Sequence, residues 1–165
     1  MKLPFNLIEW IQENKNLLKP PVGNKVLLES NDFIVMAVGG PNKRDDFHIN
    51  KTEEIFFQLE GSINLKTINK DNVVEDISIN PGELFLLPGG VPHCPQRPEG
   101  TIGIVIEKKR EDEKDIFQWR CHHCHHVTYQ ETINVKDIEK DLPVVFSNYS
   151  EFKKEKNCSN CQVTL

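Results

Sequence analysis

The chain has 165 residues, a formal net charge of -5 and 38% hydrophobic residues, which predicts one globular unit with at most a small appendage. The net acidity and the lack of a Lys/Arg stripe argue against nucleic-acid binding. The start, MKLPFNLIEW, lacks the apolar run of a signal peptide, and no stretch is long enough to span a membrane. We therefore expect a cytoplasmic protein without nucleic-acid or membrane partners.

The first predicted element is a helix. Asn6 with Glu9 three residues later forms a capping-box pattern, and apolar residues recur at helical spacing from Leu7 to Leu18. Pro20-Pro21 is expected to end this helix, because proline cannot continue the backbone hydrogen bonding.

From Val26 the pattern changes to short apolar runs separated by Gly, Pro and Asn turns. The predicted strands are Phe33–Val38, Ile55–Leu59, Ile63–Ile68, Val73–Ile79, Leu84–Leu87 and Ile102–Glu107. No helical pattern separates these runs, which favours an all-β antiparallel sandwich or barrel.

The chain changes character after the last predicted strand. Lys108–Asp115 is a dense charged run, for which we expect a solvated connection. Val135–Asp141 has the pattern of a short helix. We therefore predict a β barrel with an N-terminal helix over residues 1–115 and a C-terminal metal-binding region over residues 116–165.

Four of the five cysteines form two CxxC pairs, Cys121/Cys124 and Cys158/Cys161. In a reducing compartment such pairs are metal ligands more often than disulfides. Four thiolates provide the tetrahedral set that zinc or a single iron prefers, and they leave no open position, so we predict a structural role. The fifth, Cys94, is either a small packing residue or an oxidation-sensitive thiol.

Outside the tail the chain has two histidines, His48 and His93. His93 lies in LLPGGVPHCPQRPEG, where prolines and glycines restrict the backbone. An acidic pair, Glu53 and Glu54, follows His48, but a straight strand would separate positions 48 and 54 by about 20 Å. Sharing one metal therefore requires a turn near Asn50–Thr52, and periodicity alone does not choose between the two glutamates.

Two sequence segments that contain these histidines resemble the two motifs of the cupin family. They are His48-x5-Glu54-x6-Gly61 and Gly82-x5-Pro88-x-Gly90-x2-His93. Asp46 stands where the usual first motif has another histidine, and Arg97 stands where the second commonly has asparagine. The resemblance implies a double-stranded β-helix, or jelly-roll barrel, with a metal on His48, Glu54 and His93. Such a two-histidine, one-carboxylate set is typical of non-haem Fe(II) oxygenases.

At finer detail the chain resembles the 3-hydroxyanthranilate 3,4-dioxygenase family, in its shorter form with a rubredoxin-like tail. The matching segments are LLKPPVGN, FIVMAVGGPNKRDDFH, EEIFFQLEG, GELFLLPGGVPHCPQRPEG, VIE, both CxxC units and the DLP of Asp141–Pro143. The resemblance implies Fe(II) at the His/Glu/His set and a second Fe, or Zn, on the four cysteines. It implies conversion of 3-hydroxyanthranilate and O2 to 2-amino-3-carboxymuconate semialdehyde, the precursor of quinolinate and NAD, by a homodimer.

The resemblance also implies the remaining site residues. Arg97, Glu107 and Glu54 would contact the substrate, with Arg44 beside the dioxygen and substrate site and Asn24 nearby. Arg44 and Glu107 would take part in catalysis. Arginine suits a bidentate grip on a carboxylate, although each of these charges taken singly is equally consistent with a solvated surface.

Two alternatives stay open at this point. The same iron ligands would serve a dioxygenase of another aminophenol or catechol. A ligand-binding metal cupin acting as a sensor would bind its ligand without consuming O2. A thiol dioxygenase is disfavoured, because that chemistry typically uses three histidines.

Overall fold

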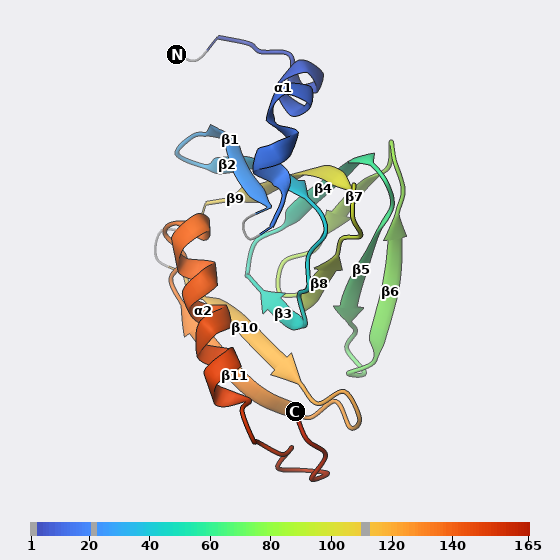
Figure 1. Cartoon of the computed structure of the whole chain (residues 1–165), viewed down its shortest axis with the longest axis vertical. Helices are drawn as coiled ribbons and strands as arrows, with labels where there is room; N and C mark the ends of the chain where they lie inside the picture. The colour runs from blue at the N-terminus through green and yellow to red at the C-terminus, as the bar shows by residue number, and fades with distance from the viewer. Residues whose placement is uncertain (1–2, 21–22, 110–112) are drawn as a thin grey trace.

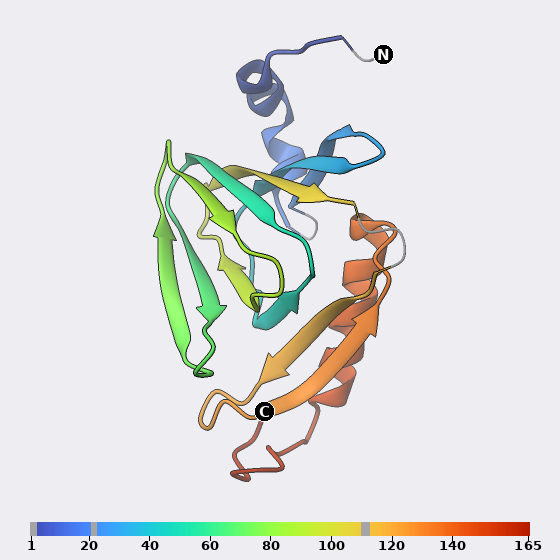
Figure 2. The same ribbon diagram turned by 180° about the vertical axis from the view of Figure 1, so that it is seen from behind.

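The computed structural model describes residues 3–20, 23–109 and 113–165 of the chain. Two antiparallel sheets face each other, with strand orders β1-β2-β9-β4-β7 and β11-β10-β3-β8-β5-β6 (Figures 1 and 2). The strands are β1 (Asn24–Glu29), β2 (Phe33–Gly39), β3 (Asp46–Ile49), β4 (Glu54–Glu60), β5 (Ile63–Ile68), β6 (Val74–Ile79), β7 (Leu84–Leu87), β8 (His93–Gln96), β9 (Ile102–Lys108), β10 (Asp115–Arg120) and β11 (Val127–Ile133). The helices are α1 (Leu7–Asn14), the short 3-10 helix η1 (Lys15–Leu18) and α2 (Ile138–Phe152).

The all-β prediction is confirmed, and each of the predicted strands is present to within one residue at either end. The strands β1, β3, β8, β10 and β11 were not predicted. Strand β8 is four residues long and contains Pro95, which cannot donate a hydrogen bond to a neighbouring strand. Its pairing with β3 and β5 depends on residues far away in the sequence, so the sequence of β8 itself has no strand pattern that would predict it.

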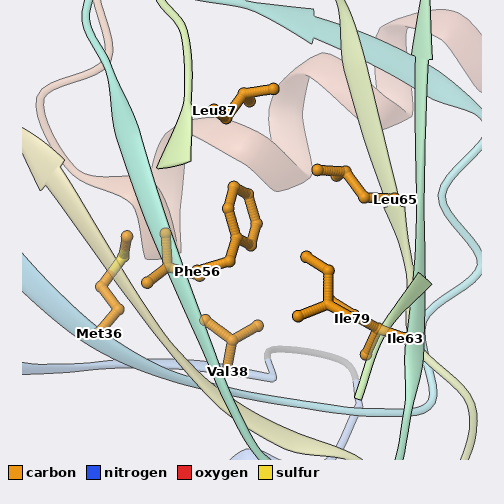
Figure 3. Close-up of a cluster of buried hydrophobic side chains, with 8 residues drawn as sticks. Met36, Val38, Phe56, Ile63, Leu65, Ile79 and Leu87 are labelled. Carbon is orange, nitrogen blue, oxygen red and sulfur yellow. The ribbon is translucent and has the colours of Figure 1, made fainter. Parts of the chain in front are cut away.

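An apolar cluster fills the space between the two sheets. Its buried members are Met36, Val38, Phe56, Ile63, Leu65, Ile79, Leu87 and Val105. Figure 3 shows the Phe56 ring in the middle of this cluster, between side chains from both sheets. Alternation along β4 puts Glu54, Phe56 and Gln58 on the buried face, so the strand that carries the core aromatic also carries polar side chains inward.

The N-terminal helix is confirmed, although it is shorter than predicted. The Asn6 side chain accepts hydrogen bonds from the backbone N–H groups of Ile8 and Glu9, as an N-cap does. Helix α1 ends at Asn14, whose side chain donates to the Trp10 carbonyl, and the chain continues as η1. Pro21, expected to help end the helix, lies outside the described residues.

A helix is present in the region predicted, Val135–Asp141, but its predicted bounds are wrong, because α2 starts at Ile138 and continues to Phe152. The Asp141 carboxylate accepts hydrogen bonds from the N–H groups of Lys136 and Asp137, which holds the preceding residues in a turn. The helix continues through Pro143 because an apolar stripe beyond it packs on the β10–β11 hairpin. No helix in the described part of the chain has both the length and the hydrophobicity needed to cross a bilayer.

The β10–β11 hairpin extends the six-stranded sheet beyond β3, and α2 runs along it (Figure 2). Cys121 and Cys124 lie in its connecting turn. Asp115 opens β10 and is only 2% exposed, so the last residue of the charged run is buried, contrary to the solvated connection that was predicted. Residues 110–112 of that run lie outside the described residues.

Candidate metal centre and its cavity

Three potential metal ligands meet where β3, β4 and β8 come together. His48 of β3 is in register with His93 of β8. The chain turns after β3, as expected, so that β4 begins at Glu54. One ligand atom from each of these residues lies within 4.8 Å of the others, and all three side chains are buried. Glu53 is exposed, which identifies Glu54 as the acidic member of the group.

The spacing of these three side chains suits a single metal ion. Oε1 of Glu54 lies 3.7 Å from Nδ1 of His48 and 3.3 Å from Nε2 of His93. Adjacent ligands bound at about 2.1 Å from one ion are about 3 Å apart, so a small adjustment suffices to bind a metal. Two imidazoles and one carboxylate would leave further coordination positions on such an ion open to other ligands.

Each ligand is held in place by a second group. Nε2 of His48 lies 3.0 Å from Oδ2 of Asp115, and Nδ1 of His93 lies 3.0 Å from the Val91 carbonyl oxygen. The Asn50 amide donates to the carboxylate ligand. Such outer contacts fix the orientation and tautomer of a metal-binding imidazole. Burial lowers the pKa of His48, whereas the Glu54 carboxylate outweighs burial and raises the pKa of His93, so a metal ion would have to displace a proton from the Glu54–His93 pair.

Asp115 is a site residue that the sequence reasoning missed. Strand β10 pairs with β3 so that Phe117 lies opposite His48, which places Asp115 diagonally across from that ligand on the same face. The available signal was the alternation of Asp115, Phe117 and Trp119, which marks the face of β10 that turns inward.

A cavity of about 600 Å³ contains the three ligands and is large enough for a small aromatic substrate. Its wall includes every other residue expected at the catalytic site: Asn24, Arg44, Arg97 and Glu107. Most of the remaining lining is apolar. A second cavity of about 580 Å³ adjoins it, and Asn24 and Glu107 line both.

Arg44 is neutralised by an ion pair inside the protein. Its Nε lies 3.0 Å from Oδ1 of Asp46, and Nη2 contacts the other carboxylate oxygen. Burial opposes both charges, but their mutual attraction raises the pKa of Arg44 and lowers that of Asp46. Asp46 stands where the usual cupin motif has a histidine, and the structure gives the reason: here the residue is the counter-ion of Arg44.

Arg97 has a different environment. It is 3% exposed, and Nη1 lies 3.5 Å from the Gln58 amide oxygen. Within the described residues Arg97 makes no ion pair. Burial and then the nearby charge of Arg44 lower its pKa to about 10, so it remains cationic at neutral pH. A buried cation with a neutral partner makes the cavity attractive to an anion.

Glu107 lies beside the metal ligands. It is directly opposite Glu54 in the pairing of β4 with β9, which places both side chains on one face of the sheet as neighbours. Glu107 is 8% exposed and lines the same cavity. The arrangement places two carboxylates side by side, one of which can bind a metal while the other can accept a proton.

Helix α2 covers one side of the cavity. Ile138, Leu142, Pro143 and Phe146 contribute to the wall, and the Arg44 guanidinium lies 5.6 Å from the Phe146 ring centroid. Sequence reasoning assigned this region only a structural metal site and missed the wall residues. Their spacing at positions 138, 142 and 146 was the available signal, because it defines one helix face.

The four tail cysteines form a second metal-binding group. Sγ of Cys121 lies 3.5 Å from Sγ of Cys161, and Sγ of Cys124 lies 3.6 Å from Sγ of Cys158. These separations exceed a disulfide bond of about 2.05 Å and approach the edge of about 3.8 Å of a metal–sulfur tetrahedron. A hydrogen bond from Asn160 lowers the pKa of Cys124 to about 6, whereas the pKa of Cys161 is raised to about 12, because the four neighbouring thiols share hydrogen bonds and titrate together.

Cys94 lies outside the cavity although it neighbours His93. Its side chain is 2% exposed and packs with Phe47 and Ile68. Burial raises its pKa to about 12, so the reactive thiolate is scarce at neutral pH. The surroundings favour the packing role over that of an oxidation-sensitive thiol.

Comparisons with known proteins agree with this geometry. The model of the family described as 3-hydroxyanthranilic acid dioxygenase matches residues 1–150. A 3-hydroxyanthranilate 3,4-dioxygenase of Xanthomonas oryzae pv. oryzae is 49% identical over 159 residues, which cover 96% of this chain and 89% of the relative. One of Bacillus thuringiensis is 40% identical over 158 residues, covering 95% and 88%.

Solved structures support the fold. A cupin-2 domain containing protein from Shewanella frigidimarina superimposes with a TM-score of 0.50 at 23% identity, covering 60% of this chain and 92% of that one. A protein from Neisseria meningitidis gives a TM-score of 0.51 at 18% identity, covering 65% and 100%. The predicted cupin fold is therefore confirmed.

Proposed function

The chain belongs to the 3-hydroxyanthranilic acid dioxygenase family, and we propose that it cleaves the ring of 3-hydroxyanthranilate with O2 at a metal held by His48, Glu54 and His93. The observation that carries this proposal is the presence, in one cavity, of this ligand set and of a buried Arg97 that makes no ion pair with any described residue. The substrate has a carboxylate at one position of the ring and an adjacent amino and hydroxyl pair. Binding this substrate therefore requires a cationic side chain for the carboxylate and a metal ion for the amino and hydroxyl pair.

We propose Fe(II) as the catalytic metal. The mixed nitrogen and oxygen donor set fits that ion, and the three side chains already converge. When bound, Fe(II) supplies a route for electron density to pass from an aminophenol ring to dioxygen. The protein's own contribution is to bind and orient the ring and to exclude water from it.

Arg97 would bind the substrate carboxylate. A guanidinium can form two parallel hydrogen bonds to a carboxylate, which fixes both the position and the rotation of the ring. Arg44 is less suitable for binding the substrate carboxylate, because Nε and Nη2 of its guanidinium already contact Asp46. We propose instead that Arg44 supplies positive charge beside the dioxygen and substrate site, with Asn24 nearby in the wall.

Glu107 would take the proton that the substrate hydroxyl loses when it binds as an anion. Its position opposite Glu54 puts this acceptor next to the ligand set, on the inner face of the sheet. Apolar side chains of Met36, Phe56 and Phe146 line the same cavity. They would strengthen these charge interactions, because a site with little water screens them less.

The test is anaerobic loading of the protein with Fe(II), followed by 3-hydroxyanthranilate and then air. O2 uptake and the absorbance of the ring-opened product, 2-amino-3-carboxymuconate semialdehyde, are recorded together. We expect equal amounts of both. Binding without O2 uptake would favour the sensor alternative, and turnover of another aminophenol or catechol with none of this substrate would change the substrate assignment.

We propose that the two parts of the chain have different roles. Residues 1–115 carry the proposed catalytic and substrate-binding side chains, and residues 116–165 bind a structural Fe or Zn through the four cysteines. The compact cluster of sulfur atoms supports the second part. Elemental analysis of the purified protein and of a Cys161→Ser variant identifies that metal.

We also propose a cytoplasmic homodimer that supplies quinolinate for NAD synthesis. The N-terminal segment is the expected contact, because Leu3, Phe5 and Ile8 are exposed apolar side chains. Light scattering combined with size-exclusion chromatography tests the dimer. A Phe5→Glu variant that stays dimeric would place the contact elsewhere.

A further inference from the structure

Two polar pairs connect the same two segments of chain. Glu54 and Gln58 are four residues apart on β4 and share its inner face. His93 and Arg97 are four residues apart on β8 and just beyond it, and both line the cavity. Glu54 lies 3.3 Å from His93, and Gln58 lies 3.5 Å from Arg97. The first pair is part of the ligand set, whereas the second has no role assigned to its glutamine.

The orientation of the Gln58 amide is determined by its surroundings. Gln58 is 1% exposed, and its Nε2 donates to the carbonyl oxygens of Glu60 at 2.9 Å and Gly61 at 2.8 Å. A reversed amide would place oxygen against both carbonyls. Both amide protons are therefore used, and the amide oxygen is the atom presented to Arg97.

Gly103 leaves the space that this pair needs. It lies directly opposite Gln58 in the pairing of β4 with β9. A Cβ atom at position 103 would lie 2.6 Å from the Gln58 amide oxygen and 3.3 Å from Nη1 of Arg97. Any side chain here would displace the guanidinium or its acceptor.

A second amide holds the backbone of Arg97. Oδ1 of Asn42 accepts a hydrogen bond from the Arg97 N–H at 2.9 Å, and Nδ2 donates to the Pro95 carbonyl at 2.8 Å. The backbone N–H of Asn42 donates to the Arg97 carbonyl at 3.0 Å. Arg97 is thus held at its backbone by Asn42 and at its guanidinium by Gln58.

Arg44 and Arg97 differ in the charge of the side chains that hold them. Asp46 neutralises Arg44, whereas amides position Arg97 and leave its charge in place. We propose that Gln58 and Asn42 are positioning residues that direct Arg97, which has no counter-ion among the described residues, at the substrate carboxylate, and thereby make the enzyme selective for an aminophenol that carries a carboxylate. This inference rests on the proposed function, in which Arg97 binds that group.

The test compares two ligands that differ by the carboxylate alone, 3-hydroxyanthranilate and 2-aminophenol. Dissociation constants are measured by calorimetry without oxygen on the Fe(II)-loaded protein. The wild type is expected to prefer 3-hydroxyanthranilate by about tenfold to a hundredfold, the range for a hydrogen bond to a charged group. Gln58→Glu places a carboxylate against Arg97, so the preference should fall to about one while 2-aminophenol binding stays within about twofold.

The chain offers a matched control in Gln118. It is also buried, and its amide oxygen accepts a hydrogen bond from Arg120 at 2.9 Å, but neither residue lines the cavity. Gln118→Glu should leave the preference at its wild-type value. Asn42→Ala should weaken the binding of 3-hydroxyanthranilate more than that of 2-aminophenol, because it releases the backbone of Arg97.

Each outcome has a distinct meaning. A Gln58→Glu protein that keeps the wild-type preference would overturn the inference and leave the proposed function intact. A wild type that binds neither ligand would overturn the proposed function and this inference with it. If Gln58→Glu does not fold, Gln58→Met removes the acceptor without adding charge. A severalfold loss confined to 3-hydroxyanthranilate supports the inference, and equal loss for both ligands shows a merely structural role.

Discussion

Replacing Asp46 by asparagine is expected to destabilise the protein strongly, because it removes the counter-ion of Arg44. The Asp46 side chain is 1% exposed and that of Arg44 is 19% exposed. Removing one partner of a buried ion pair costs about 3–5 kcal/mol, because the other charge stays buried and uncompensated. The remaining exposure of Arg44 puts the expected loss near the lower end, at about 3 kcal/mol.

A loss of that size is easily measured. For a chain of this length it corresponds to a decrease in Tm of about 6–12 °C. Urea unfolding of wild type and Asp46→Asn at pH 7, with equal metal content, gives the difference in free energy of unfolding. The control is Asp76→Asn, which removes an ion pair with Lys66 whose side chains are 38% and 58% exposed. Such an exposed pair contributes less than about 1 kcal/mol.

The pH dependence supplies a second check. The pKa of Asp46 lies below its ordinary value of 3.8 in the folded protein, so this carboxylate stabilises the fold fully above that value. Its contribution is lost as the pH falls through the lowered folded pKa. The difference between wild type and Asp46→Asn should therefore be constant near neutral pH and shrink in acid. An Asp46→Asn variant no less stable than Asp76→Asn at pH 7 would refute the reasoning.

Three further outcomes are expected. A thiol reagent at pH 8 should leave Cys94 unmodified in the folded protein, as peptide mapping would show, since burial raises its pKa to about 12; rapid labelling would contradict its packing. His48→Ala should abolish turnover while the tail keeps its metal, whereas Cys161→Ser should mainly lower Tm; loss of catalytic metal from both variants would refute this division. Gly103→Ala should raise the Kd for 3-hydroxyanthranilate more than that for 2-aminophenol, because the added methyl group contacts Arg97 and its acceptor.

The sequence is most informative where chemistry depends on spacing along the chain. The proposed ligands could be named because His48, Glu54 and His93 stand at the positions that the two cupin motifs, which the chain resembles, give to metal ligands. The choice between Glu53 and Glu54 needed a recognised motif, because both occur in the same acidic pair. The buried Glu54 and the exposed Glu53 agree with that motif.

Residues whose surroundings come from distant parts of the chain were not identified. Asp115 is 67 residues from His48, and its position depends on the pairing of β10 with β3. Gln58 was quoted only as part of a motif, since its contact with Arg97 requires the two sheets to face each other. Helix α2 was placed too early because Asp141 and Pro143 resemble a helix end when read locally.

Helix α2 has a consequence for the order in which the protein matures on the ribosome. The proposed ligands and substrate-binding residues have all been synthesised by Glu107, whereas the cavity wall residues of α2, Ile138, Leu142, Pro143 and Phe146, are synthesised later. On the ribosome the cavity therefore lacks one of its walls until α2 has emerged and packed on the β10–β11 hairpin.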